Sequence, residues 1–359
     1  MIAPRLEVDL DKVAHNAGVL VNRLATSGIR VTGVTKATLG SPDVAAAMVR
    51  GGVAGLSDSR IENLGRLRAA GMAMPLTLIR SPMLSQVDAV VRHCDVSLNT
   101  EPIILAALSD AADDQKVIHE VVLMVELGDL REGLASTDVL EVAQLVGQLS
   151  GLTLAGIGTN LACQSGVVPD QSKMDELSAL VEDVEAACGH RLSVVSGGNS
   201  ASLSWALTTD DVGRVDDLRL GESILLGTEP LHREAITGLH TGAFALVAEV
   251  IEVKTKPAQP WGEIAQGAFG TPPPRLASGG LVRQAILALG HQDVDPAGLT
   301  PPDGVSLLGA ASDHLVVDVG ELAVTPGDEL TFQLDYSALV RAMTSPYVTT
   351  TVNGVPAGR

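Results

Sequence analysis

The sequence predicts an α/β fold: a (β/α)8 barrel of the TIM type, followed by a C-terminal β-rich domain. Up to about residue 232, short β-branched apolar runs alternate eight times with longer stretches of helical periodicity. Strand and helix repeated eight times in roughly 230 residues match the size of such a barrel. After residue 233, prolines become frequent and the apolar runs alternate at period two, which is typical of antiparallel strands.

The first domain is expected to span residues 1–232. Its eight predicted strands lie near residues 31–36, 53–57, 76–80, 94–98, 118–126, 152–159, 192–196 and 217–226. Helical stretches between them include 59–70, 101–112, 137–149 and 171–188. The segments Ser41-Pro42-Asp43 and Thr100-Glu101-Pro102 are typical helix starts, because proline fits the first turn. The alternative, an open doubly wound sheet, requires a glycine-rich turn after strand one, where this chain has Lys36-Ala37-Thr38-Leu39-Gly40.

The second domain is expected to span residues 233–359. Its predicted strands are Ala243–Lys254, Gln284–Leu289, His314–Val319 and Glu329–Leu334. The run Arg5–Leu10, at the start of the chain, is a candidate further strand of the same sheet.

Composition excludes several classes of partner. The chain has 359 residues, 46% of them hydrophobic and 19% charged, enough to bury a large core. A net charge of −19, with only two Trp, two Tyr and three Phe, disfavours nucleic acid. No segment resembles a membrane span or a signal peptide, so we expect a cytoplasmic protein. The three cysteines, Cys94, Cys163 and Cys188, lack metal-site spacing, and each is expected to be a small buried residue; no metal is expected.

Lys36 is distinct among the six lysines because it closes the first predicted strand. The carboxyl end of a barrel strand is where active-site residues lie. Burial there would favour the neutral amine, which can form a Schiff base and later carry a proton. The alternative is an ordinary strand-end lysine whose ammonium group reaches water.

Two glycine-marked turns follow the last two predicted strands, where barrels commonly bind phosphate. The first is Ser196-Gly197-Gly198-Asn199-Ser200, whose glycines permit close backbone approach and whose amides can open a short helix toward an anion. The second is Arg219-Leu220-Gly221-Glu222-Ser223. Tight turns need glycine for structural reasons as well. Taken with Lys36, the two turns predict a site for pyridoxal phosphate.

Arg219 lies in an apolar stretch that continues as Ile224-Leu225-Leu226, so its charge is expected to point into the barrel. A structural role would pair it with Asp217 or Glu222. A functional role would set the guanidinium against the ring nitrogen of the cofactor. Because arginine stays protonated, it would keep that nitrogen unprotonated.

Arg131 and Asn160 are two further candidates, because they follow the fifth and sixth predicted strands. Arg131 stands among acidic residues, so a surface ion pair is the alternative. Asn160 would otherwise be a turn residue. At a barrel mouth, both would face a ligand.

In these residues the chain resembles the alanine racemase superfamily of pyridoxal-phosphate enzymes, which have a fold-type III barrel, and within it the ornithine racemase branch. The opening Glu7-Val8-Asp9-Leu10-Asp11-Lys12-Val13, with Asn16, resembles the start of the family. The resemblance covers essentially the whole chain. It runs through residues 57–60, 80–84, 126–133, 195–200, 219–227, 288–293 and 312–314.

The resemblance implies a role for each of these candidates. Lys36 would hold the cofactor covalently, and Arg219 would face its ring nitrogen. Arg131 would lie near the phenolic oxygen of the cofactor and Asn160 near its ring. Contacts with the phosphate are implied for Ser200, Gly221, Glu222 and Tyr347.

The chain departs from this family at the second acid/base. Alanine racemases use a tyrosine from the partner subunit's β-domain, but the comparable stretch here is Gln259-Pro260-Trp261-Gly262, and tryptophan accepts no proton. Met124 stands where some members carry a modified lysine. Racemisation needs a group on each face of the carbanion, so we expect the second base from a β-domain across a dimer interface. The candidates are His291, Asp293, Asp313 and His314.

The sequence therefore predicts a homodimeric isomerase, a pyridoxal-phosphate-dependent amino-acid racemase with two bases and with sites at the subunit interface. A substrate such as ornithine or another basic amino acid fits the ornithine racemase branch and the acidic net charge of the chain. One alternative is a pyridoxal-phosphate-dependent lyase or aldolase acting on D-amino acids. The other is a non-catalytic cofactor carrier, against which the large β-domain argues.

Overall fold

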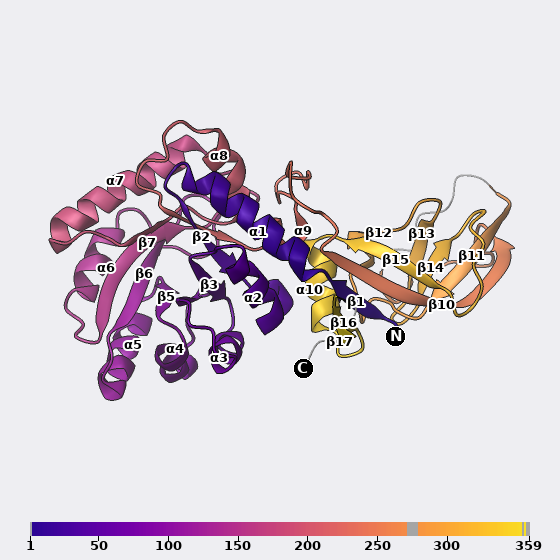
Figure 1. Cartoon of the computed structure of the whole chain (residues 1–359), viewed down its shortest axis with the longest axis horizontal. Helices are drawn as coiled ribbons and strands as arrows, with labels where there is room; N and C mark the ends of the chain where they lie inside the picture. The colour runs from indigo at the N-terminus through magenta and orange to yellow at the C-terminus, as the bar shows by residue number, and fades with distance from the viewer. Residues whose placement is uncertain (1, 271–278, 354, 357–359) are drawn as a thin grey trace. The chain divides into compact units, whose positions relative to one another are not determined.

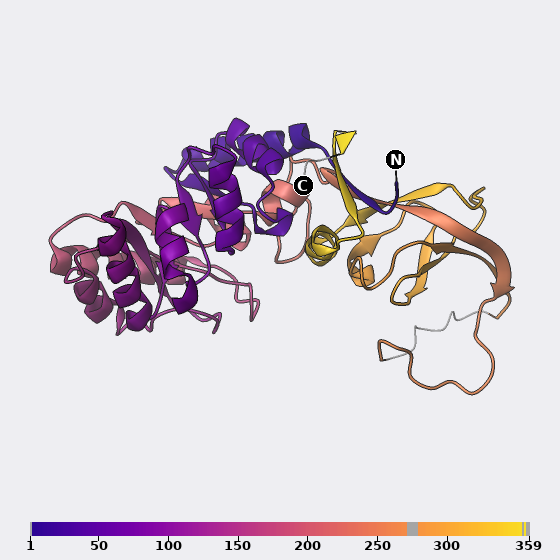
Figure 2. The ribbon, with the colours of Figure 1, turned by 90° about the horizontal axis from the view of Figure 1, so that it is seen from below.

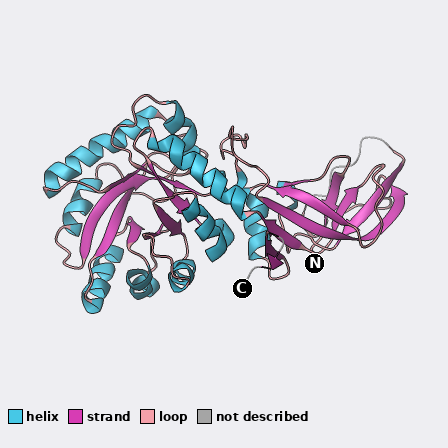
Figure 3. Cartoon of the chain, viewed as in Figure 1, coloured by secondary structure: helices cyan, strands magenta, loops and turns pink. Residues whose placement is uncertain are grey.

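The computed structural model describes residues 2–270, 279–353 and 355–356. The chain divides into two compact units, one formed by residues 11–241 and the other by residues 1–10 together with 242–359. Figure 1 labels most of the helices and strands, and Figure 3 distinguishes helix from strand. Among the described residues, no helix is both long and apolar enough to cross a bilayer.

Residues 11–241 form a closed barrel of eight parallel strands. In barrel order these are β2 (Arg30–Val34), β3 (Gly55–Asp58), β4 (Leu76–Leu78), β5 (Val96–Asn99), β6 (His119–Val125), β7 (Leu152–Thr159), β8 (Val194–Ser196) and β9 (Asp217–Leu220). The barrel closes where β2 pairs with β9, with Thr32 beside Arg219 and Gly33 beside Leu220. Closure confirms the predicted fold class and excludes an open sheet.

Helices surround the strands of the barrel, as Figure 1 and the turned view in Figure 2 show. They are α1 (Leu10–Ala25), α2 (Pro42–Arg50), α3 (Ile61–Ala69), α4 (Val87–His93), α5 (Pro102–Gln115), α6 (Val139–Val146), α7 (Gln171–Cys188), α8 (Leu203–Thr208) and α9 (Glu222–Leu226), with 3-10 turns η1 (Lys36–Thr38), η2 (Leu84–Gln86) and η3 (Ser200–Ser202). The predicted starts of α2 and α5 are confirmed. Ser41 caps α2 by accepting a hydrogen bond from the Val44 amide at 3.4 Å, and proline opens both helices.

Two predicted strands end earlier than expected, and both corrections concern the candidate site. β2 ends at Val34, so Lys36 begins the turn η1 rather than closing the strand. β9 ends at Leu220, and the apolar residues 224–226 belong to the short helix α9. A short buried apolar run does not distinguish strand from helix by its pattern alone. The break falls at Gly221, where a Cβ would lie 3.1 Å from the Cβ of Val34.

The barrel interior holds a small apolar cluster formed by Leu98, Val122, Met124 and Ala155. Met124 is buried there, on β6. The position at which the resemblance places a modified lysine is therefore occupied by a core side chain in this chain.

The second unit is built on a nine-stranded sheet. The main path runs in the order β13 (Ser306–Ala310), β14 (Leu315–Asp318), β11 (Leu281–Leu287), β10 (Phe244–Pro257), β1 (Arg5–Val8), β16 (Thr349–Val352) and β17 (Val355–Pro356). Off this path, β15 (Glu329–Leu334) pairs with β10 and with β12 (Leu299–Thr300); η4 (Pro296–Gly298) and α10 (Tyr336–Thr344) complete the unit.

The start of the chain belongs to this sheet. β1 pairs antiparallel with β10 and parallel with β16, which confirms the expected strand near Arg5–Leu10. Arg5 is buried, and its guanidinium donates to the Glu329 carboxylate with 2.6 and 2.8 Å contacts. This bidentate ion pair joins β1 to β15 on the far side of β10.

One buried histidine makes the stability of the barrel sensitive to pH. His119, the first residue of β6, is buried, and its Nε2 lies 2.8 Å from the Ser97 hydroxyl oxygen. Burial lowers the pKa of His119 to about 4, because the charged imidazolium would lose its hydration. The folded barrel therefore holds this side chain neutral.

We expect the unfolded chain to bind a proton at His119 near pH 6.5, whereas the folded chain resists it until about pH 4. This contribution to stability is complete above pH 6.5 and is lost as the pH falls toward 4, by on the order of 2–3 kcal/mol. His119→Gln should flatten this part of the pH dependence of the free energy of unfolding, measured by urea titration at several pH values. His232→Gln, at a side chain that is 73% exposed, is the control. Identical pH profiles for His119→Gln and the wild type would contradict the assignment.

Candidate active site

Lys36 lies just beyond the carboxyl end of β2, as the first residue of η1. The following Leu39 and Gly40 have positive φ values of 53° and 63°, so the chain reverses tightly. A Cβ at Gly40 would lie 2.7 Å from the Cβ of Asn63, so the turn packs directly against α3. Lys36 is half-buried. Within the described part of the chain, its amine has no hydrogen-bond or ion-pair partner.

Arg219 is buried on β9 and is held by the ends of two neighbouring strands. Its guanidinium donates to the Ser196 hydroxyl on β8 and, at 2.8 Å, to the backbone carbonyl of Thr159 on β7. Ser196 in turn donates to the Asp217 carboxylate at 2.7 Å, and Thr32 donates to the same carboxylate at 2.6 Å. Ser196, expected as a cofactor contact, thus links a buried cation to a buried anion.

The pKa of Arg219 reflects two opposed effects. Burial lowers it, because the desolvated guanidinium is costly to keep charged, and the negative charge of Asp217 raises it. Arginine stays protonated even when buried. The β9 strand therefore supplies a fixed positive charge at the centre of the barrel.

The two glycine-marked turns lie side by side at the same end of the barrel. η3 begins at Ser200 directly after β8, and α9 begins at Glu222 directly after β9. The hydroxyl of Ser200 lies 3.0 Å from that of Ser223 and accepts a hydrogen bond from the Ser223 amide at 3.2 Å. These contacts bring two short helix starts together, an arrangement whose backbone N–H groups favour an anion.

Two features fix the shape of the first turn. Gly198 has a φ of 116°, and a Cβ there would lie 2.6 Å from the Ser202 hydroxyl. Asn199 accepts a hydrogen bond from the Ala201 amide at 2.7 Å and so caps η3. Any residue larger than glycine at position 198 would fill the space between the turn and its own helix.

Asn160 follows β7 and faces the first turn. Its Oδ1 accepts a hydrogen bond from Nδ2 of Asn199 at 3.0 Å. Its own Nδ2 is buried and has no partner among the residues that the structure describes. A buried amide donor without a partner costs free energy, so this atom is suited to a ligand.

Arg131 lies in the loop after β6 and forms a bidentate ion pair with Glu132. This pair raises the pKa of Arg131, and a hydrogen bond with Cys163 contributes in the same direction. The surface ion pair considered from the sequence is present. Both residues follow β6 in the chain, at the carboxyl end of the barrel strands.

The loops after β6 and β7 form one rim. Asp129 is fully buried, and its carboxylate accepts hydrogen bonds from the amides of Gln164 and Ser165 at 2.9 and 3.0 Å. Cys163, expected to be buried, is exposed on this rim, with its sulfur 3.3 Å from Nδ2 of Asn199. The preceding Ala162 has a positive φ of 63°, so the loop turns outward there and carries the thiol to the surface.

The four candidates for the second base lie in the other unit, and the structure brings them together in two adjacent loops. The amides of His291 and Gln292 donate to the carbonyls of Ala311 and Ser312 at 3.0 and 2.9 Å. The loop of His291 and Asp293 therefore lies beside the loop of Asp313 and His314. A Cβ at Gly290 would meet the Ala311 carbonyl oxygen at 2.5 Å, so glycine is required for this approach.

These four side chains differ in their surroundings. Asp293 is buried and accepts hydrogen bonds from the Gly290 amide at 3.1 Å and from the Ser345 hydroxyl at 2.9 Å. The ring of His291 packs 4.1 Å from that of Phe269. The other two form an exposed pair, with Nδ1 of His314 2.8 Å from Asp313, which lowers the pKa of the Asp313 carboxyl.

Tyr347 belongs to the same neighbourhood. Its amide donates to the Ser345 hydroxyl at 3.2 Å, and Ser345 is the residue that binds Asp293. The Tyr347 side chain is 68% exposed, and that of Trp261 is 83% exposed. Among the described residues of this unit, both aromatic rings are thus presented to the surface.

Sequence reasoning missed two buried side chains next to the site. Ser223 holds the two turns together, and Asp58 accepts a hydrogen bond from Thr35, the residue before Lys36. The signal available for Asp58 is its position as the last residue of β3, at the same end of the barrel as Lys36. Ser223 stands in the second glycine-marked turn, but its contact with Ser200 depends on the pairing of β8 with β9 and has no local signal.

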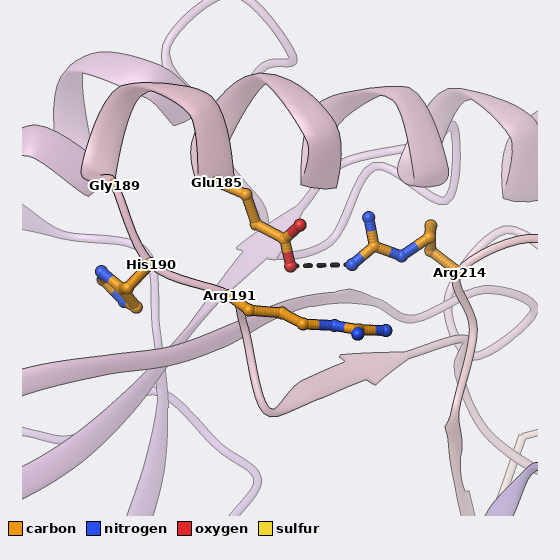
Figure 4. Close-up of a pocket in the computed structure, with 5 residues that line it drawn as sticks. All are labelled: Glu185, Gly189, His190, Arg191 and Arg214. Carbon is orange, nitrogen blue, oxygen red and sulfur yellow. Dashed lines mark hydrogen bonds and ion pairs between the residues drawn. The ribbon is translucent and has the colours of Figure 1, made fainter.

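Two of the cavities in the described part of the chain adjoin the barrel strands. One of about 230 Å³ lies inside it and runs from beneath Arg219 and Asp217 to the first residues of the strands, such as Arg30. The other, of about 600 Å³, is an open depression near the starts of β8 and β9, lined by Glu185, Gly189, His190, Arg191 and Arg214. Figure 4 shows its Arg214–Glu185 ion pair, at 2.7 Å. Neither contains Lys36.

Comparison with known proteins shows the family to which the chain belongs. The model of the family "Alanine racemase, N-terminal domain" matches residues 8–230. The chain belongs to this family. It is 37% identical over 351 residues to the lysine racemase of Thermotoga maritima, covering 97% of this chain and 98% of that protein.

Other relatives agree. The chain is 36% identical over 349 residues to the ornithine racemase of Acetoanaerobium sticklandii, covering 96% of this chain and 98% of that one. In structure it is similar to the alanine racemase of Streptomyces coelicolor A3(2), with a TM-score of 0.77, 19% identity and 97% of each chain covered. At this identity the structural likeness concerns the fold alone.

Proposed function

We propose that this protein is a pyridoxal-phosphate-dependent racemase of a basic amino acid, acting as a homodimer in the cytoplasm. That it is an amino-acid racemase is shown by its nearly full-length likeness to two racemases at 36–37% identity. The cofactor, the substrate and the roles of individual residues are what we add. One observation carries the proposal: the pairing of β2 with β9 sets Lys36 and Arg219 at the same end of the barrel as both turns.

The residues present fit pyridoxal phosphate, the cofactor that the resemblance to the alanine racemase superfamily implies. An unpaired amine at Lys36 suits an aldehyde, and the fixed charge of Arg219 suits a pyridine nitrogen. The unpartnered Nδ2 of Asn160 suits a polar atom of the ring or its substituents. The phosphate would be held by Ser200 together with the backbone amides of Gly221 and Glu222.

When bound, pyridoxal phosphate supplies an electron sink that acidifies the α-hydrogen of an amino acid. Lys36 would hold it and, once released by the amine of the substrate, would move the α-proton on one face. Arg219 would place its positive charge beside the ring nitrogen of the bound cofactor and would disfavour protonation of that nitrogen. The ion pair with Glu132 orients the guanidinium of Arg131 at the mouth of the barrel. We propose that this guanidinium would contact the phenolic oxygen of the cofactor.

The second base must come from another part of the molecule, because Lys36 serves one face only. We assign it to the β-rich unit of a second copy of the chain, at the subunit interface. The exposure of the Asp313–His314 pair supports a role for His314, because a proton-carrying group must be reachable by the substrate. Asp293 is better suited to anchoring the His291 loop through Gly290 and Ser345.

The basic substrate is supported by the names of the two relatives, which are a lysine racemase and an ornithine racemase. The net charge of −19 favours the approach of a cationic substrate in the same direction.

The direct experiment incubates pure protein and pyridoxal phosphate with each L-amino acid and follows the products by chiral chromatography. We expect D-ornithine or D-lysine, with kcat/KM at least about tenfold above that for alanine or serine. Lys36→Ala should abolish the reaction. The proposal is refuted if no amino acid is converted to its opposite enantiomer. Release of an aldehyde from a D-3-hydroxy amino acid would favour a lyase instead.

Replacing the second base should stop racemisation without disturbing the bound cofactor. Among His291→Ala, Asp293→Ala, Asp313→Ala and His314→Ala, we expect one to lower kcat by about 10²–10⁴-fold while the visible absorption of the cofactor is retained. The thermal unfolding of each variant shows whether Asp293→Ala loses activity because the His291 loop is destabilised rather than because a base is removed. If all four variants racemise at the wild-type rate, the second base does not come from these loops.

A further inference from the structure

A fully buried carboxylate lies directly beside the turn that begins at Lys36. Asp58 is the last residue of β3, the strand that neighbours β2 in the barrel (Figure 1). Burial raises the pKa of Asp58, and its hydrogen-bond donors act in the opposite direction. An acidic side chain in such a place is costly unless its oxygens are bonded, so its partners indicate what it is for.

Both oxygens of Asp58 are bonded to segments next to the candidate site. Oδ2 accepts a hydrogen bond from the Thr35 hydroxyl at 2.8 Å. Oδ1 accepts from the amide of Arg60 at 2.9 Å and from Nδ2 of Asn63 at 3.0 Å. One carboxylate thus joins the residue before Lys36 to the first turn of α3.

Thr35 controls the geometry of the turn through its backbone. Its amide donates to the Ser57 carbonyl at 2.9 Å, which continues the pairing with β3. Its carbonyl accepts from the amides of Thr38 and Gly40 at 2.9 and 3.3 Å and from the Thr38 hydroxyl at 3.0 Å. The Thr35 carbonyl therefore accepts the hydrogen bonds that close η1, the turn that starts at Lys36.

The other end of the turn is fixed by the same group of residues. Gly40 packs against Asn63 so closely that a Cβ would lie 2.7 Å away, and Asn63 donates to Asp58. The turn of Lys36 is bracketed at its start by Thr35 and at its end by Asn63. Asp58 binds both.

We propose that Asp58 is a positioning residue for Lys36, acting through the Thr35 hydroxyl to fix the direction in which the lysine leaves the barrel. This inference rests on the proposed function, in which Lys36 holds pyridoxal phosphate. We expect Asp58 to affect the rate at which the Lys36 amine reacts with the aldehyde of the cofactor. A misplacement of the amine by about 1 Å is enough to slow a reaction on the order of 100-fold.

The hydrogen-bond geometry separates a positioning role from a role of charge. In Asp58→Asn, the amide oxygen can still accept from Arg60 and Asn63. The new NH₂ can donate to the oxygen of Thr35, whose own hydrogen can turn to the Ser57 carbonyl, already 3.2 Å away. This variant removes the charge and keeps the connection, whereas Thr35→Val removes the connection and keeps the charge.

The test measures covalent attachment rather than catalysis. Full-length protein freed of cofactor is mixed with pyridoxal phosphate, reduced with borohydride at set times and analysed by peptide mass mapping for labelled Lys36. We expect Thr35→Val to slow attachment on the order of 10–100-fold, and Asp58→Asn and Thr35→Ser to stay within about threefold of the wild type. Thr351→Val, a buried threonine of the β-rich unit whose hydroxyl donates to the Leu6 carbonyl, should attach at the wild-type rate.

Failure of the inference and failure of the proposed function are distinguishable. If wild-type protein is never labelled at Lys36, the proposed function is wrong. If Lys36 is labelled and Thr35→Val reacts at the wild-type rate, Asp58 does not position it. If Asp58→Asn is as slow as Thr35→Val while Thr35→Ser is normal, charge matters rather than position, and the inference is overturned. Thr35→Ala, compared with Thr35→Ser, gives the same comparison should Thr35→Val fail to fold.

Discussion

The pairing of β2 with β9 closes the barrel, and the arrangement of the site depends on it. Through this pairing Thr32 lies beside Arg219 and Gly33 beside Leu220, and Lys36 follows the end of β2 at the same end of the barrel. Gly221 lies where the two strand ends meet, and a Cβ there would lie only 3.1 Å from the Cβ of Val34. Residues from the first and last strands of the barrel thus become neighbours, although most of the domain separates them in the sequence.

The buried charge of Arg219 has an energetic cost in this arrangement. A desolvated guanidinium is stable only when it is hydrogen-bonded and electrostatically balanced. Ser196 and Thr159 provide the hydrogen bonds, and Asp217, connected through Ser196, provides the opposite charge. Thr32 completes the network from β2, so the strands that close the barrel also stabilise its central cation.

The features that sequence reasoning predicted are those that depend on local pattern. Alternating apolar runs and helical stretches indicated the barrel, and proline indicated the starts of α2 and α5. The position of Lys36 followed from the end of a strand. The exact end was missed by two residues, because the turn about the Thr35 carbonyl is set by contacts with β3 and α3 rather than by sequence.

The features that were missed depend on contacts between distant segments. Residues 224–226 were expected in a strand and form part of α9, because a short buried run fits both. Cys163 was expected to be buried, but a loop with a positive φ at Ala162 carries it to the rim. The hydrogen bonds by which Asp58 joins Thr35 to Asn63 have no signal in the sequence beyond an acidic residue after an apolar run.

The central claim is that the barrel presents Lys36 and Arg219 to a single molecule of pyridoxal phosphate. A crystal structure of the protein with this cofactor bound tests the claim most directly. We predict a covalent bond to Nζ of Lys36, the ring nitrogen facing the guanidinium of Arg219 and the phosphate at the turns of Ser200 and Gly221. Attachment to any of the other five lysines, or a ring nitrogen remote from Arg219, would contradict it.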